Sequence, residues 1–176
     1  VRGQAGRRPE ALDQRAAVQT DDVLDGIDLA GRRFVITGAA SGLGEESTRA
    51  LAAHGASILM LARDPQKNAD AAERVRAAVP DADLSLDTVD LADLSSVRAF
   101  AGRYLDSGRP IDVLMNNAAI RISEDFGNYT RDQFDLGIAV NLAAPFFASQ
   151  AVLPRARATT ASKWTSCTTV SRACNA

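Results

Sequence analysis

The stretch Arg33–Gly44, RFVITGAASGLG, decides the fold of this 176-residue chain. Its first five residues form an apolar run that stops at a glycine, which is typical of a buried strand. The rest spaces three glycines as G-x-x-x-G-x-G, and good helix formers follow. Glycines between a strand and a helix let the backbone approach a ligand closely, and the helix offers free N–H groups to a phosphate. The stretch therefore predicts a binding site for the pyrophosphate of a dinucleotide.

The residue after the last glycine is Glu45. Phosphate-hydrolysing P-loops need a lysine at that point, so the sequence argues against that class of protein. The alternative interpretation of the glycines is an ordinary structural turn that holds no ligand.

Further apolar runs and helical patterns alternate along the chain. Pro145 is expected to kink the last helix. Strands that alternate with helices predict an α/β fold with a parallel sheet covered on both faces. Ligands of such sheets bind at the carboxyl ends of the strands. Beyond the opening stretch, strands are expected at 57–62, 84–89 and 111–115, and helices at about 45–54, 65–79, 94–105 and 131–153.

Composition limits the classes of function. The net charge is −2, which leaves no basic surface for nucleic acid, and no apolar run approaches the roughly 18 residues of a membrane span. Residues 1–26 are expected to form a flexible leader without a secretory signal. The only cysteines, Cys167 and Cys174, lack metal-ligand spacing and predict neither a disulfide framework nor a metal site. The expected location is therefore the reducing cytoplasm.

Two charged residues follow predicted strands. Arg63 ends the second strand, at the position that contacts the adenosine ribose in dinucleotide-binding folds, where an arginine can hold a 2′-phosphate. The alternative is a solvated surface charge beside Asp64, which would cap the next helix. Asp90 follows the third strand and could accept a hydrogen bond from an adenine amino group. A helix-initiating acid in a loop is the alternative there.

Asparagines supply a third set of candidates. Asn116 and Asn117 end the fourth strand, where amide side chains can tie neighbouring loops together through a donor and an acceptor. An Asn-rich turn is the alternative. Asn141 is polar within the apolar stretch 138–147, where it would bend the helix or form a hydrogen bond in the core.

Together these motifs resemble the short-chain dehydrogenase/reductase family in their order and spacing. The matching segments are Thr37–Gly44, Asp90–Leu91, Asn116–Ala119 and Val140–Leu142. The resemblance covers about residues 27–154, a partial dinucleotide-binding domain. Within the family, the segments Val23–Gly31 and Ala62–Asp64 are similar to the branch of retinol dehydrogenases and protochlorophyllide reductase-like proteins. One departure is Ala119, where the family usually has glycine.

The resemblance implies a Rossmann-type, doubly wound parallel sheet, incomplete at its C-terminal side, that binds NADP in preference to NAD. The reaction would be hydride transfer to or from a small-molecule carbonyl or alcohol substrate. Asn141 would support a water-linked proton relay. The residues implied to line the pyrophosphate are Gly38, Ser41, Gly42, Leu43 and Gly44. The other implied contacts are Arg63 with the 2′-phosphate, Asp90 and Leu91 with adenine, and Asn116 and Ala118 with the nicotinamide-side ribose.

The chain departs from the family where the chemistry takes place. The family's reaction needs a tyrosine followed four positions later by a lysine, but Tyr104 and Tyr129, the two tyrosines, are followed there by Gly108 and Gln133. Ser171 is the candidate for the family's catalytic serine. Residues 155–176 are expected to be a divergent tail, whose composition suggests a frameshift or a premature end of the coding sequence.

Three alternatives follow from this departure. The chain is an NADP-dependent oxidoreductase, a catalytically inactive nucleotide-binding remnant, or a fragment that does not fold stably. A fragment would expose apolar side chains such as Phe146 and Phe147. For the full-length family form, the resemblance also allows a homo-oligomer.

Overall fold

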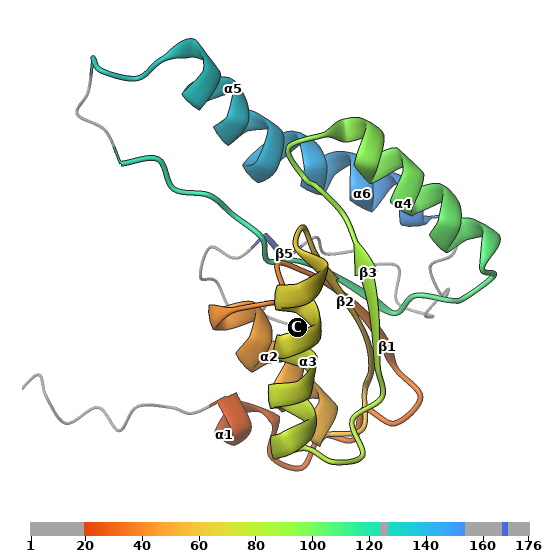
Figure 1. Cartoon of the computed structure of the whole chain (residues 1–176). Helices are drawn as coiled ribbons and strands as arrows, with labels where there is room; N and C mark the ends of the chain where they lie inside the picture. The colour runs from red at the N-terminus through yellow and green to blue at the C-terminus, as the bar shows by residue number, and fades with distance from the viewer. Residues whose placement is uncertain (1–19, 124–126, 154–166, 169–176) are drawn as a thin grey trace, which may run out of the picture.

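The computed structural model describes residues 20–123, 127–153 and 167–168, which contain a five-stranded parallel sheet (Figure 1). The strand order is β3-β2-β1-β4-β5, so the chain runs outward from β1 on one side and returns to its other side at β4. The predicted Rossmann-type α/β fold is confirmed, and its topological switch point lies between the carboxyl ends of β1 and β4. The strands are β1 (Arg33–Thr37), β2 (Ser57–Ala62), β3 (Leu84–Thr88), β4 (Val113–Asn116) and β5 (Cys167–Thr168).

Helices connect the first four strands, as predicted. The helix after β1 begins at Gly42 rather than near residue 45, because the last two glycines of the turn belong to its first turn. The helices are α1 (Thr20–Leu24), α2 (Gly42–Ala53), α3 (Pro65–Ala78), α4 (Leu94–Asp106), α5 (Arg131–Ile138) and α6 (Ala144–Val152), with a π-helical segment at Ala139–Ala143 between the last two.

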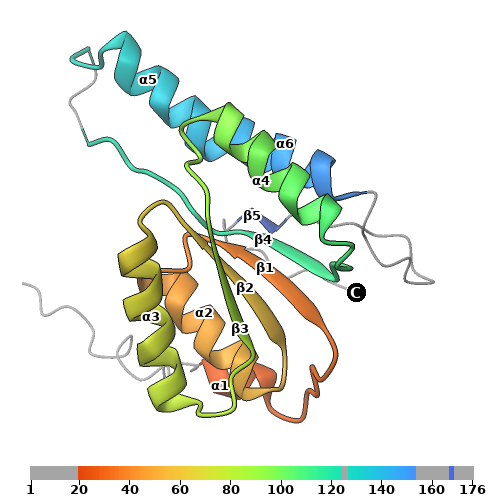
Figure 2. The same cartoon turned by 45° about the vertical axis from the view of Figure 1, so that its right-hand side comes forward.

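Helices α2 and α3 lie on one face of the sheet and α4 and α6 on the other (Figure 2). Strand residues alternate between two apolar cores, one on each face. Val35 and Leu59 pack in the core that α4 and α6 cover. Their neighbours Phe34 and Met60 pack in the core that α2 and α3 cover. Successive side chains of a strand point to opposite faces, so a sheet with helices on both faces needs continuously apolar strands. For this reason the short apolar runs in the sequence predicted β1 and β2 correctly.

The expected long helix, 131–153, is interrupted rather than simply kinked. The π-helical segment Ala139–Ala143 comes directly before Pro145, which lies in the first turn of α6. A proline has no N–H for the i→i−4 hydrogen bond, and the wider π turn accommodates the missing bond. Asn141 lies in this π-helical segment.

The combined segment Arg131–Val152 is apolar on much of its surface. It has 22 residues and a mean hydropathy of 1.2 in an 18-residue window, so by length and composition alone it could cross a membrane. This qualifies the expectation that the chain holds no such segment. Only 28% of that window is buried, although α6 packs in the core with α4. The outer side chains Phe146 and Phe147 are exposed and meet edge to face at 5.2 Å between ring centroids.

Both ends of the chain were expected to lie outside the domain. Within the predicted leader, α1 contacts the domain because Asp21 pairs with Arg49 of α2 at 2.9 Å. Within the predicted tail, Cys167 and Thr168 pair in parallel with Met115 and Asn116. The assignments of 1–26 as a leader and 155–176 as a divergent tail stay predictions.

Candidate functional site

The glycine-rich turn owes its shape to three glycines with different physical roles. Gly38 and Gly42 have φ angles of +65° and +56°, a region that favours glycine. A Cβ at Gly38 would also lie 2.9 Å from the Cα of Ala118, whereas one at Gly42 would meet nothing within 4 Å. A Cβ at Gly44 would lie 2.2 Å from the main-chain oxygen of Gly38. The turn is therefore packed at both ends and open in the middle.

Hydrogen bonds tie this turn to the segment after β4. The main-chain N–H groups of Asn117 and Ala118 donate to Thr37 Oγ1 at 3.0 and 3.1 Å. The side-chain amide of Asn117 donates to the main-chain oxygen of Thr37 at 3.0 Å. The expectation that an asparagine here joins neighbouring loops is thus confirmed for Asn117. Asn116 instead points its amide to Ser149 Oγ of α6 at 3.2 Å and is buried.

An open cleft of about 820 Å³ runs along the carboxyl ends of the strands. It extends from the glycine-rich turn past the ends of β2 and β3 to the segment after β4. Four candidates lie outside its lining: Gly42, Gly44, Asn116 and Asn141. The candidates that do line it are Gly38, Ser41, Leu43, Arg63, Asp90, Leu91, Asn117 and Ala118. The structure thus brings eight of the candidate residues to one cleft, from four separate segments of the chain.

The end of β2 and the start of α3 each contribute a cation to the cleft. Arg63 is exposed there, and Asp64 caps α3, because its Oδ1 accepts from the main-chain N–H groups of Gln66 and Lys67 at 3.0 and 3.1 Å. The interpretation of Asp64 as a helix cap is confirmed. Lys67 lines the same cleft and was not a candidate. Its position four residues after Arg63, in the first turn of the predicted helix, was the signal that could have identified it.

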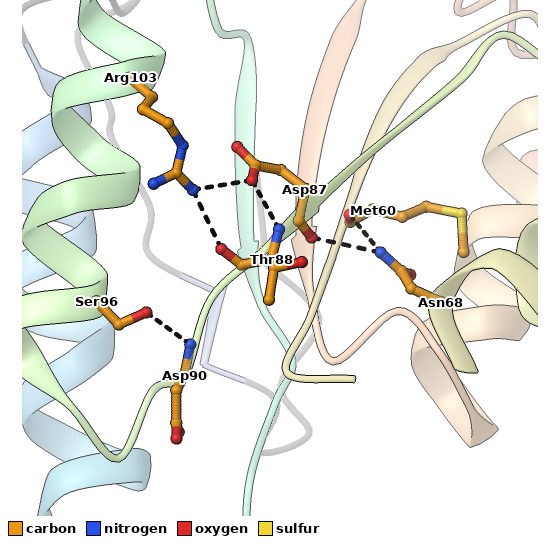
Figure 3. Close-up of polar contacts among 7 residues, drawn as sticks. All are labelled: Met60, Asn68, Asp87, Thr88, Asp90, Ser96 and Arg103. Carbon is orange, nitrogen blue, oxygen red and sulfur yellow. Dashed lines mark hydrogen bonds and ion pairs between the residues drawn. The ribbon is translucent and has the colours of Figure 1, made fainter. Parts of the chain in front are cut away.

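The end of β3 is held from both sides (Figure 3). On one side, Arg103 of α4 donates to Asp87 Oδ1 at 2.8 Å and to the main-chain oxygen of Thr88 at 3.2 Å. On the other, the amide of buried Asn68 donates to the main-chain oxygens of Met60 and Asp87 at 3.0 and 3.4 Å. Because β3 is an edge strand, these side chains take the place of a second neighbouring strand in fixing where it ends.

Asp90 begins the loop that leaves β3 and enters the cleft. Its N–H donates to Ser96 Oγ at 2.9 Å, and its Oδ1 accepts from the N–H of Ala92 at 2.9 Å (Figure 3 shows the Ser96 contact). The residue that caps α4 is Asp93, which accepts from the N–H of Ser95 at 2.8 Å. Asp90 is therefore a turn-forming residue of the cleft and does not initiate the helix.

Asn141 lies beyond this cleft, in the π-helical segment. Its Oδ1 accepts from the N–H of Ile120 at 2.9 Å, and its Nδ2 donates to the oxygen of the same residue at 2.9 Å. Both side-chain functions are thus engaged with one backbone unit after β4. The hydroxyls of Tyr104 and Tyr129 donate to the main-chain oxygens of Pro110 and Ile122, at 3.0 and 2.6 Å. Ser171 lies outside the described residues.

Glu45, which stands where a P-loop would have lysine, is paired rather than free. Arg74 of α3 holds its carboxylate in two parallel contacts of 2.8 and 2.9 Å. The hydrogen bond from Arg74 lowers the pKa of Glu45, against a smaller opposing effect of burial. The pairing offsets a negative charge in the first turn of α2, next to the glycine-rich turn.

Comparisons with known proteins agree with this geometry. Residues 32–164 match the family model described as short chain dehydrogenase. Retinol dehydrogenase 12 of Mus musculus is 33% identical over 129 residues, which are 73% of this chain and 40% of the relative. Dehydrogenase/reductase SDR family member 13 of Bos taurus is 35% identical over 77% of this chain and 35% of its own length. The chain thus spans well under half of the curated relatives it matches.

Solved structures show the same likeness. A metagenomic short-chain oxidoreductase in complex with NADP superposes with a TM-score of 0.66 and 31% identity, over 72% of this chain and 57% of that one. A Pseudomonas aeruginosa RhlG/NADP complex superposes with a TM-score of 0.66 and 27% identity, over 73% of this chain and 49% of that one. Both of these proteins were solved with NADP.

Proposed function

Because the chain belongs to the short-chain dehydrogenase/reductase family, with relatives in its retinol dehydrogenase-like branch, we propose that it binds NADP(H) in the cleft described above. The nicotinamide cofactor of such oxidoreductases supplies or accepts a hydride, and the substrate class is a small-molecule carbonyl or alcohol. The observation that carries the proposal is the convergence of the glycine-rich turn, Arg63 and the Asp90–Leu91 loop on one cleft.

The residues of the cleft fit a dinucleotide. At Gly38 the positive φ and the contact with Ala118 leave no room for a side chain, so the backbone itself faces the cleft. Gly38, Ser41 and Leu43 would lie along the pyrophosphate, beside the first turn of α2. Asp90 keeps one carboxylate oxygen outside its turn hydrogen bond, and that oxygen would accept from an adenine amino group.

The choice of NADP over NAD rests on Arg63. It lines the cleft at the end of β2, and within the part of the chain that the structure describes no ion pair neutralises it. An unpaired guanidinium there suits a 2′-phosphate, whereas an acid would suit the free 2′-hydroxyl of NAD.

For the 176-residue chain itself, we propose nucleotide binding without turnover. The sequence contains no tyrosine followed four positions later by lysine, and both tyrosine hydroxyls are bonded to main-chain oxygens. The resemblance to the family implies a catalytic role for Ser171 and a proton relay through Asn141. We propose these roles only for a full-length protein that also has the family's tyrosine and lysine.

Titration with NADPH and NADH, followed through the fluorescence of the reduced nicotinamide, tests the cofactor proposal. NADPH is expected to bind more tightly, and Arg63→Gln should bring the two affinities together. Arg98→Gln is the matched control, because Arg98 is an exposed arginine of α4 away from the cleft lining. Equal affinities in the unchanged chain would overturn the choice of NADP. Absence of binding by a folded sample would overturn the proposed function.

A further inference from the structure

The strand β3 is outermost in the described sheet, so one of its edges has no neighbouring strand (Figure 2). In a parallel pair of strands, the main-chain groups of alternate residues turn toward the neighbour. The N–H of Ile58 in β2 donates to the main-chain oxygen of Asp83 at 2.9 Å, which sets this alternation along the strand. The residues whose main-chain N–H and C=O groups face the open edge are therefore Leu84, Leu86 and Thr88.

Two arginines reach this open edge from opposite faces of the sheet. Arg76 of α3 donates to the main-chain oxygen of Leu84 at 3.1 Å. Arg103 of α4 donates to the main-chain oxygen of Thr88 at 3.2 Å (Figure 3). The N–H of Thr88 donates to Asp87 Oδ1 at 2.7 Å. Side chains therefore hold outward-facing main-chain groups at both ends of β3.

The contact of Arg76 is not an ion pair. Arg49, Arg74 and Arg103 each hold a carboxylate at 2.7 to 2.9 Å, whereas Arg76 forms no ion pair within the part of the chain that the structure describes. Holding a long, exposed side chain in one conformation costs entropy, which offsets much of the gain from one hydrogen bond. The main effect of this contact is therefore to occupy the edge of the sheet.

The middle of the edge is open. The outward main-chain groups of Leu86 have no hydrogen-bond partner among residues 20–123, 127–153 and 167–168, and this leucine is 41% exposed. An open strand edge with an exposed apolar side chain is a template for pairing with another chain. Two copies related by a two-fold axis would pair their β3 strands antiparallel about Leu86. In that register, Leu84 of each copy lies opposite Thr88 of the other.

We infer that Arg76 and Arg103 prevent β3 from pairing edge to edge with β3 of a second copy of this chain. Each guanidinium occupies a carbonyl oxygen that the second strand would need. In the antiparallel register, Arg76 at Leu84 would also meet Arg103 at Thr88 of the other copy, and like charges at close range repel each other. None of these residues lines the cleft, so the inference is independent of the proposed function.

Sedimentation velocity over a range of protein concentrations tests this role in the 176-residue chain. The double variant Arg76→Ala/Arg103→Ala should self-associate at least about tenfold more tightly than the unchanged chain, because several main-chain hydrogen bonds become available at once. Hydrogen exchange locates the contact, since the Leu86 amide of the double variant should exchange more slowly as protein concentration rises. Adding Leu86→Lys should reverse the gain, because the two lysines would lie directly opposite each other.

Arg98→Ala/Arg121→Ala is the matched control, because it removes the same charge from two exposed arginines that have no hydrogen bond to β3 in the described part of the chain. It should leave self-association unchanged. Unaltered association of the Arg76→Ala/Arg103→Ala chain would overturn the inference.

Stronger association without slower exchange at Leu86, or association that Leu86→Lys does not reverse, would also overturn it, since the contact would then lie on another surface. If the double variant does not fold, Arg76→Ala alone, which breaks no ion pair among the described residues, should still slow exchange of the Leu86 amide at high protein concentration. Exchange that is independent of concentration in that variant would count against the inference in the same way.

Discussion

Gly44 packs so tightly on Gly38 that a Cβ at position 44 would lie 2.2 Å from the main-chain oxygen of residue 38. The same Cβ would lie 2.6 Å from Nδ2 of Asn117. The first turn of α2 therefore packs directly against the residue that follows β1 and against the loop after β4. Gly44 therefore lies where the three segments at the glycine-rich end of the cleft meet.

Gly44→Ala should destabilise the chain by about 1–3 kcal/mol, because the added methyl group must displace backbone. The displacement also moves the start of α2 away from the glycine-rich turn. Nucleotide affinity should therefore fall together with stability. Thermal melts with and without NADPH measure both effects.

Two other glycines are controls for that substitution. Gly102→Ala lies inside α4, where a Cβ meets nothing within 4 Å, so it should be neutral or stabilise by about 0.5–1 kcal/mol. Gly42→Ala also finds open space but has a φ of +56°, which should cost about 1–2 kcal/mol of strain. A Gly44→Ala chain as stable as Gly102→Ala would show that the close contact is relieved without cost.

Asn141→Ala should release the segment after β4. The change removes both hydrogen bonds to Ile120, and each such bond contributes about 0.5–1.5 kcal/mol. The expected result is faster hydrogen exchange at the Ile120 amide and a lower melting temperature. Asn141→Asp keeps the acceptor for that N–H and should protect the amide better than alanine does. Unchanged exchange at Ile120 in Asn141→Ala would contradict the contact.

The Glu45–Arg74 pair should make stability depend on pH in the acid range. The hydrogen bond from Arg74 lowers the pKa of Glu45 below its usual value of 4.5, so the unfolded chain takes up the proton first as pH falls. The contribution is therefore present in full above that value and is lost as pH falls through the lowered pKa. Urea unfolding should show Arg74→Gln less stable than the unchanged chain at pH 7, with the difference shrinking below about pH 4.

Arg76→Gln is the matched control for this pH dependence. Arg76 lies in the same helix but donates to the main-chain oxygen of Leu84, at 3.1 Å, and not to an acid. Its effect on the free energy of unfolding should therefore vary little between pH 7 and pH 4. A difference for Arg74→Gln that is constant with pH would contradict the pairing.

The 176-residue chain should show no turnover with NADPH and a panel of aldehydes and ketones. Both tyrosine hydroxyls donate to main-chain oxygens, and no lysine stands four residues after either tyrosine. Consumption of NADPH, followed at its absorbance maximum, is the measurement. Substrate-dependent consumption above a no-enzyme control would show that another group transfers the proton.

Local patterns in the sequence predicted much of the fold. β1 and β2 follow from unbroken apolar runs, because strands covered on both faces must be apolar throughout. The caps at Asp64 and Asp93 also follow from sequence, since each acts on an N–H only two or three residues away. The candidate site could be listed from the ends of the predicted strands, where parallel sheets bind ligands.

Other features could not be predicted because they depend on which strand lies next to which. Asn141, in the π-helical segment that interrupts the long helix, is bonded to the loop after β4, so the expectation of a simple kink at Pro145 was incomplete.

The sequence by itself determined the alternating strands and helices, the glycines of the first turn, and the polar residues at the strand ends. Only the tertiary structure decided which of these polar residues contact one another. Asn117 rather than Asn116 joins the loops, because the sheet order places Thr37 beside a residue 80 positions away. Contacts of this kind are set by chain packing, which no local pattern encodes.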